Sequence, residues 1–260
     1  MISRKVTFAV QTTLINFLYH IGNFVRWHRS IFKKPENWKM YYKETIRQMY
    51  DIGVGSIMII FIVNVFIGAV TAVQFIYQLS GTLIPKYYIG YIVRDMALIE
   101  LAVTFTSIIL AGKVGSNIAS EIGGMRQKEH IDAMEIMGVN TSSYLVLPKL
   151  LAALLVIPLL VSVAAIVSIA GGYFATVYSG SYSHEEFIQG LRSFFNPFNV
   201  KMMYIKAFIF AYILTSIACY QGYFVKGGSV ELGQASTRAV VYGIIVVLIA
   251  DYIIAVVLTV

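Results

Sequence analysis

The chain has 260 residues, of which 58% are apolar and only 13% charged, and its mean hydropathy is +0.74. A soluble domain carries about 45–50% apolar and about 25% charged residues, so one water-soluble core cannot bury this much apolar surface. This composition excludes a soluble enzyme, a disordered chain and a nucleic-acid-binding domain. We therefore expect an all-α membrane protein, in which the net charge of +7 comes from basic residues beside the spans.

The first 50 residues differ from the rest of the chain. Apolar residues recur there at spacings of three or four, and polar residues occupy the other faces. This pattern predicts an amphipathic helix that lies in the membrane interface and does not cross the bilayer, so residues 1–50 form an interfacial segment. The apolar positions are Val6, Val10, Leu14, Phe17, Ile21 and Val25.

Charge-free stretches locate the membrane spans that follow. Residues 52–85, 150–184 and 207–225 contain no Asp, Glu, Lys or Arg. A helix needs about 20 mostly apolar residues to cross a bilayer, so each stretch is long enough for one span. Two further apolar segments each tolerate one acid, Glu100 and Asp251. The five predicted spans cover residues 52–79, 93–117, 145–178, 201–224 and 239–260.

The distribution of Lys and Arg predicts the orientation. Segments 1–50, 113–149 and 225–238 together hold fifteen basic residues, whereas 80–94 and 179–206 hold five. Because basic loops stay in the cytoplasm, we expect a cytoplasmic N-terminus and an outward-facing C-terminus.

Glu100 and Asp251 are ionisable groups at membrane depth. A charge at mid-span costs about 2.5–3.5 kcal/mol on insertion scales, so such a group faces protein or water, or is neutral. Two interpretations stay open: a proton relay or substrate contact, and a hydrogen-bonded pin between helices. We favour the structural interpretation for both acids.

Small residues line one ridge of the second span and its continuation. Ala111, Gly115, Ala119 and Gly123 follow one another at intervals of four. Such a ridge lets another helix backbone approach closely. The partner is either another span of the same chain or a second subunit.

Residues 125–138, between the second and third spans, predict a short amphipathic helix that ends near Gly138. Ile131, Met134 and Met137 fall on one side of it. The helix either fits a groove in a partner protein or lies flat on the membrane, and the pattern alone does not choose. Its polar residues are Glu129, His130, Asp132 and Glu135.

The sequence contains no catalytic set. The phosphate-binding pattern G-x-x-x-x-G-K-[ST] is absent, so we expect no ATP hydrolysis by this chain alone. The four histidines have no metal-ligand spacing. We expect neither an enzyme nor a cofactor or metal site in this chain.

Two stretches resemble the MlaE-type permease family, the membrane subunits of Mla/Mce lipid ABC transporters. One is AGKVGSNIASEIGGMRQKEHIDAMEIMGVN, from Ala111 to Asn140; the other is Cys219–Val241, followed by Asp251. Val103 departs from the family pattern, which usually has proline there, and Ser236 replaces a common threonine.

The resemblance implies a single permease domain over residues 1–260, with residues 125–138 as the coupling helix that docks into a cytoplasmic ATPase. It also implies a permease homodimer, two ATPase subunits that bind ATP and Mg²⁺, a small regulatory subunit on each ATPase, and an Mce-domain ring on the outer side of a bacterial inner membrane. The implied cargo is phospholipid. The positions that match the coupling motif are Glu129, Ile131, Asp132, Ala133 and Glu135.

The resemblance places the lipid in an outward-facing cavity between two permeases, lined by the first, second and fifth spans. A lipid site needs an apolar wall for the acyl chains and a few polar groups for the headgroup. The first span offers such polar groups on its outward half. The candidate lining residues are Asn64, Thr71, Gln74, Tyr77 and Gln78.

Two alternatives are weighed against a permease. The first is an ion-coupled secondary transporter that uses Glu100 and Asp251. Such transporters are commonly built from inverted repeats, and five spans give no inverted repeat, which argues against this alternative. The second is a membrane scaffold that transports nothing. Proton dependence without ATP dependence would favour the first alternative, and assembly without lipid movement would favour the second.

Overall fold

The computed structural model describes residues 22–31, 38–81, 83–180 and 182–259, all of them in helices or short connections, with no strand among them. Five helices are long and apolar enough to cross a membrane, which confirms the all-α fold with five spans. The second span is one continuous helix built from α-helical and π-helical segments. The long helices are α2 (Trp38–Leu79), the composite of α3 (Tyr88–Met96), η1 (Ala97–Leu101), α4 (Ala102–Leu110), η2 (Ala111–Gly115) and α5 (Ser116–Gln127), then α7 (Thr141–Tyr178), α9 (Pro197–Tyr223) and α10 (Ser229–Thr259).

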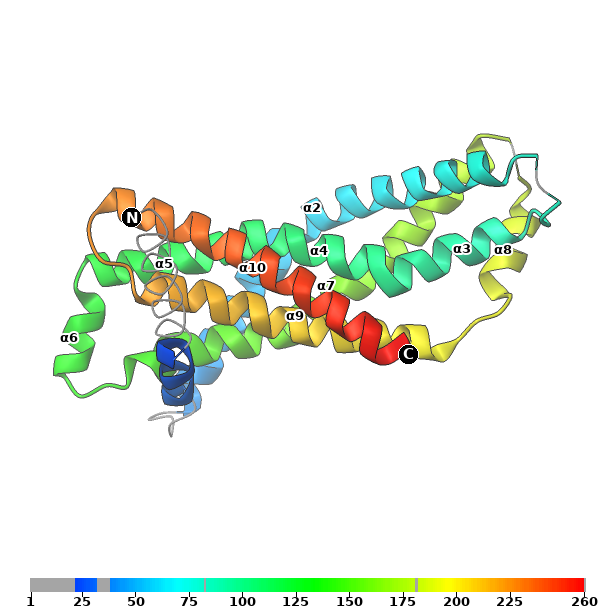
Figure 1. The fold of residues 1–260 in the computed structure, drawn as a ribbon. Coiled ribbons are helices and arrows are strands. Elements are labelled where there is room, and N and C mark those ends of the chain that lie inside the picture. The colour runs from blue at the N-terminus through cyan, green and yellow to red at the C-terminus, as the bar shows by residue number, and fades with distance from the viewer. Residues whose placement is uncertain (1–21, 32–37, 82, 181, 260) are drawn as a thin grey trace, which may run out of the picture.

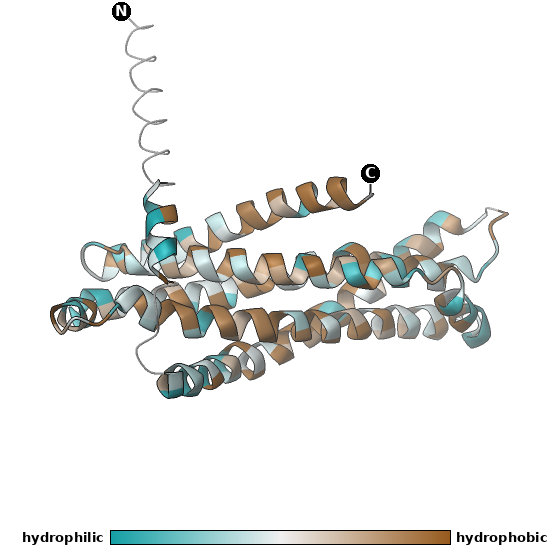
Figure 2. Ribbon diagram, turned by 90° about the horizontal axis from the view of Figure 1, so that it is seen from below, coloured by the Kyte–Doolittle hydropathy of each residue, from teal (hydrophilic) through white to brown (hydrophobic). Residues whose placement is uncertain are grey.

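The long helices run roughly along one axis (Figure 1). Two short helices mark the ends of the bundle: α6 (His130–Ile136) lies at one end and α8 (His184–Arg192) at the other. Hydrophobic residues dominate the middle of the bundle and hydrophilic residues gather near both ends (Figure 2). This distribution is the one that a bilayer imposes on a bundle of spans.

The first span differs from its predicted start. Helix α2 begins at Trp38, so residues 38–50 continue into the predicted span as one helix. The charged residues there end the apolar stretch, but charge does not end a helix. Most of the predicted amphipathic positions, from Val6 to Ile21, lie outside the described residues. Residues 22–31 form a helix in which Trp27 and Ile31 are buried.

Helices α2 and α7 form the most extensive helix pair. At Gly68 the two backbones meet so closely that a Cβ atom would lie 1.8 Å from the Ser168 carbonyl oxygen. At Gly171 a Cβ atom would lie 2.2 Å from the Val65 carbonyl oxygen. Membrane helices gain little from the hydrophobic effect when they associate, so close backbone approach at small residues supplies much of the packing.

Helix α8 was not among the predicted elements. Its N-terminus is a capping box, in which the Ser183 hydroxyl accepts from the Glu186 backbone N–H and the Glu186 carboxylate accepts from the Ser183 N–H. The spacing Ser-x-x-Glu is the sequence signal that would have located this helix. Arg94 then fixes α8 to α3 by donating to the carbonyl oxygens of Leu191 (2.6 Å) and Ser193 (2.9 Å).

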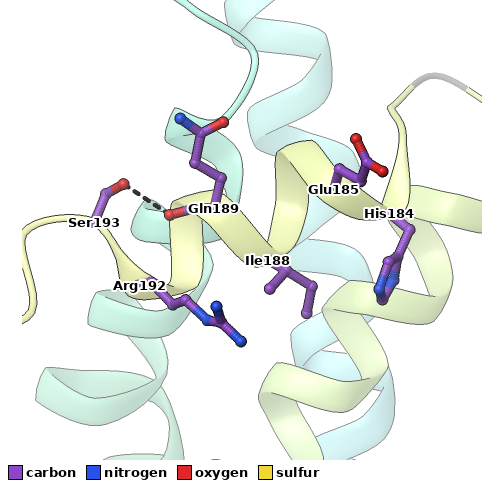
Figure 3. Close-up of a pocket in the computed structure, with 6 residues that line it drawn as sticks. All are labelled: His184, Glu185, Ile188, Gln189, Arg192 and Ser193. Carbon is purple, nitrogen blue, oxygen red and sulfur yellow. Dashed lines mark hydrogen bonds between the residues drawn. The ribbon is translucent and has the colours of Figure 1, made fainter.

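The exposed side of α8 bears a shallow depression (Figure 3). At its end the Ser193 hydroxyl donates to the Gln189 carbonyl oxygen over 2.7 Å, which helps to close the last turn of the helix. The lining residues are His184, Glu185, Ile188, Gln189, Arg192 and Ser193.

We expect Gly68→Ala to lower stability by about 1–3 kcal/mol, because the added methyl group meets backbone that cannot move without separating α2 from α7. Thermal unfolding of the purified protein in detergent measures the loss. Gly233→Ala is the matched control, since a Cβ atom there meets nothing within 4 Å. Equal melting temperatures for the two variants would contradict the close contact.

Candidate functional site

The loop after the second span folds into helix α6, which covers the middle of the predicted 125–138 helix. Residues up to Gln127 belong to α5, and Glu129 separates the two helices in a left-handed conformation with φ 59°. Ile131 is fully buried and Met134 packs against the core. Met137, expected on the same apolar side, is 71% exposed because α6 ends at Ile136.

Charged and hydroxyl side chains hold α6 against the membrane-spanning helices. Arg126 pairs with Asp132 at 2.9 Å and with Glu135 at 3.6 Å. Glu135 also accepts from the Tyr223 hydroxyl at 2.8 Å and from the Thr141 hydroxyl at 3.2 Å. Asp132 and Glu135, two of the three acids of the predicted coupling helix, therefore anchor α6 within the chain, and their removal would loosen the helix as well as change its surface.

The opposite side of α6 is open. Ile136, at a polar end of the molecule, is 87% exposed. Together with Met137 it forms an apolar tip at the end of α6, a helix that the contacts of Asp132 and Glu135 hold in place. Other exposed residues of α6 and its N-cap are Glu129, His130, Ala133 and Glu135.

Tyr223, at the end of α9, links α6 to the N-terminal helix of residues 22–31. The centre of its ring lies 5.7 Å from that of the Trp27 ring, and the Arg126 guanidinium lies over the Tyr223 ring, 5.8 Å from its centre. In the same helix His28 contacts the Tyr212 hydroxyl, and burial lowers the pKa of the His28 imidazole below its ordinary value. The helix of residues 22–31, α9 and α6 thus pack together.

The two acids at membrane depth meet at one lysine. Lys206 of α9 is fully buried, and its ammonium lies 2.7 Å from Glu100 Oε2 and 2.7 Å from Asp251 Oδ1. It also donates to the Ile99 carbonyl oxygen at 3.1 Å, and the Thr104 hydroxyl donates to Asp251 at 3.1 Å. The cluster joins the second, fourth and fifth spans, and Glu100 belongs to the π-helical segment η1, a type of distortion found often at functional sites.

Sequence reasoning missed Lys206 and a second buried lysine. Both were counted as basic residues at span ends, whereas the structure places Lys206 inside α9 and Lys149 inside α7. Lys149 is buried and pairs with Glu121 at 2.5 Å. The available signal was the presence of an acid in another apolar segment, because a buried charge needs a partner of opposite sign.

The candidate lipid-lining residues separate into two groups. Asn64 is fully buried and donates to the Ile60 carbonyl oxygen (2.8 Å) and to Thr106 (3.3 Å), so it pins α2 to α4 and lines no cavity in this chain. Thr71 is half-buried and donates to the backbone of its own helix. The other three are exposed near the outer end of α2, and they are Gln74, Tyr77 and Gln78.

The small-residue ridge packs mainly within the chain. A Cβ atom at Gly222 of α9 would lie 2.7 Å from the Ala119 carbonyl oxygen, and one at Gly123 would lie 2.5 Å from Leu232. Ala111 is buried, whereas a Cβ atom at Gly115 would meet nothing within 4 Å. In the isolated chain this ridge serves the contact with α9 and α10.

Comparisons with known proteins show the family of this chain. A family profile described as Permease MlaE matches residues 45–257. The chain belongs to the MlaE permease family. A probable ABC transporter permease protein of Rickettsia bellii is 32% identical over 86% of this chain and 85% of its own length. One of Synechocystis is 30% identical over 81% of this chain and 80% of its own. The chloroplastic protein TRIGALACTOSYLDIACYLGLYCEROL 1 of Arabidopsis thaliana is 25% identical over 84% of this chain and 62% of its own.

As an MlaE-family permease, the chain is a membrane subunit of an ABC transporter. Its two departures from the family pattern are accommodated locally. Val103 is fully buried in α4 directly after η1. The Ser236 hydroxyl lies 2.7 Å from that of Ser120 and joins α10 to α5, a hydrogen bond that a threonine hydroxyl can also form.

We expect Lys206→Met to destabilise the protein by about 3–5 kcal/mol, because it leaves two carboxyl groups facing each other without their cation. The triple variant with Glu100→Gln and Asp251→Asn removes all three charges, and we expect it to recover most of the lost stability. Thermal unfolding in detergent measures both changes. A triple variant as unstable as the single one would show that packing and not charge holds this position.

We expect Tyr223→Phe to loosen α6, because it deletes the hydroxyl that bonds to Glu135 and Thr141. Loss of a charge-assisted hydrogen bond of about 1.4 kcal/mol corresponds to about tenfold faster hydrogen exchange of the α6 amides. Tyr178→Phe is the matched control, since Tyr178 is almost fully exposed. Unchanged exchange in the Tyr223 variant would contradict the anchoring role.

Proposed function

We propose that this chain is the permease subunit of a phospholipid-moving ABC transporter, which works as a homodimer and takes its driving force from a separate ATPase that docks on α6. The apolar tip of α6 carries the proposal. A rigidly anchored helix with exposed Ile136 and Met137 offers a partner a protruding apolar contact, and hydrophobic anchors in a partner groove dominate the energy of such interfaces.

The cargo is inferred from the surfaces that the chain leaves open. In the apolar stretch of α10 only 17% of the residues are buried, and in that of α2 only 28%. Both helices therefore present apolar faces to lipid or to a second copy. The two helices lie on different sides of the bundle (Figures 1 and 2). Near its outer end α2 adds exposed Gln74, Tyr77 and Gln78, which supply hydrogen bonds for a headgroup. The name of the Arabidopsis relative refers to a galactosyl diacylglycerol lipid, which supports a lipid cargo.

The proposed setting is a bacterial inner membrane with α6 and the N-terminus in the cytoplasm and the C-terminus outside. The excess of Lys and Arg near the α6 end supports this orientation. In this arrangement ATP and Mg²⁺ bind to the ATPase, a small regulatory subunit sits on the ATPase, and an Mce-domain ring receives or delivers lipid on the α8 side.

The buried cluster does not favour the ion-coupled alternative. Both Glu100 and Asp251 are bonded to Lys206, and Asp251 also accepts from Thr104. Proton uptake by either carboxyl group would break an ion pair that holds three spans together. We therefore assign the cluster to the framework of the transporter.

The test is ATP-dependent movement of fluorescent phospholipid in vesicles that contain the chain and its cognate ATPase. We expect transport with ATP in the wild type and at least tenfold slower transport for Ile136→Glu, together with loss of ATPase co-purification, because a charge replaces the apolar contact. Leu83→Glu is the matched control, since Leu83 is fully exposed at the opposite end of the bundle.

Two results would overturn the proposal. Transport driven by a proton gradient without ATP would establish the ion-coupled alternative. Binding of the ATPase without any lipid movement in the wild type would support a scaffold. If Ile136→Glu retained both ATPase binding and transport, the assignment of α6 as the docking helix would be wrong.

A further inference from the structure

A polar cleft lies between the first and second spans, on the α6 side of the molecule. It has a volume of about 460 Å³ and separates one face of α2 from η2 and the first turns of α5. All of its lining residues come from these three elements. Its polar lining residues are Gln48, Asp51, Lys113, Ser116, Asn117 and Ser120.

The cleft brings together one acid and one base. A Cβ atom at Gly55 would lie 3.6 Å from the Lys113 ammonium, so this ammonium lies against α2 at Gly55. Gly55 is one helical turn after Asp51 on the same helix. Among the described residues neither Asp51 nor Lys113 takes part in an ion pair within 4.0 Å. The two opposite charges therefore face a common space and are open to a ligand that carries both signs.

The depth of the cleft matches that of lipid headgroups. Asp51 is the last charged residue before the charge-free stretch 52–85, and Lys113 follows the apolar part of the second span. Both residues thus lie where hydrocarbon gives way to the polar interface. Beyond the cleft the same face of α2 is apolar and exposed, with Val54, Met58 and Ile62 available to acyl chains.

We infer that this cleft binds the headgroup of a phospholipid that carries a phosphate and a primary amine. The Lys113 ammonium donates to the phosphate oxygens, and the Asn117 side-chain amide adds a hydrogen bond. The Asp51 carboxylate accepts from the lipid ammonium. The acyl chains lie along the apolar face of α2, so the site combines a few polar groups with an apolar wall.

The site extends the proposed function, on which it depends only for its orientation. With α6 in the cytoplasm, the cleft faces the cytoplasmic leaflet, whereas Gln74, Tyr77 and Gln78 lie toward the outer one. The permease then has a lipid position at each surface of the membrane.

The test is native mass spectrometry of the full chain in mild detergent, titrated with dioleoyl phosphatidylethanolamine, phosphatidylglycerol and phosphatidylcholine. No ATPase or nucleotide is present, so this experiment and the transport assay fail independently. We expect the ethanolamine lipid to bind about tenfold more tightly than the other two, the value that one charge-assisted hydrogen bond supplies. Phosphatidylcholine has a quaternary ammonium that cannot donate to Asp51, and phosphatidylglycerol has no amine.

Two variants separate the charges. Asp51→Asn should weaken binding of the ethanolamine lipid about tenfold and leave phosphatidylglycerol unchanged, whereas Lys113→Gln should weaken both by about tenfold. Lys43→Gln is the matched control, since Lys43 is exposed on α2 outside the cleft. Both cleft charges are exposed, and the melting temperature of each variant confirms folding. Equal binding of the three lipids, or cleft variants that bind like the Lys43 variant, would overturn the assignment.

Discussion

One ammonium group connects three of the five spans. Lys206 lies between Glu100 and Asp251, and these residues come from the second, fourth and fifth spans. The first and third spans are joined differently, by direct backbone contact at Gly68 and Gly171. Both solutions follow from the same constraint: inside a bilayer, apolar side chains gain little by leaving lipid for protein, so charge pairing and close approach must hold the helices together.

Helix α9 connects the ion cluster around Lys206 with helix α6. It carries Lys206 inside the bundle and Tyr223 at the α6 end, 17 residues apart, which is roughly 25 Å along a helix. At one end it contacts α6 and the N-terminal helix, and at the other it contacts η1 and α10. A force on α6 therefore reaches the spans along this rigid helix, as well as through the direct contacts of α6 with α5 and α7.

The sequence predicted the helices well, but it did not predict which side of each helix is buried. Five spans follow from apolar length alone, and the loop helix followed from its amphipathic pattern. Helix α2 runs through the expected boundary at residue 50, because charged residues end the hydrocarbon segment but not the helix. Lys206 escaped notice for a related reason, since a lysine beside an apolar run looks like a boundary until the acids that face it are known.

The pattern could not sort the polar residues of the first span into inward-facing and outward-facing ones, for a geometrical reason. Helix α2 is apolar around its whole circumference over the membrane, so no periodicity tells which polar residue points inward. Asn64 is buried against α4 while Gln74 is exposed, and only the packing of the neighbouring helices separates them. Partner contacts on α6 posed the same problem, because its acids turned out to bind within the chain.

The ion cluster also has a consequence for biosynthesis. Asp251 lies in the fifth span, and a lone aspartate at the centre of an inserting helix costs about 2.5–3.5 kcal/mol. Lys206 belongs to the span made just before it and provides the cation that offsets this cost. Insertion of the fifth span thus depends on correct placement of the fourth, which makes the order of synthesis part of how the bundle assembles.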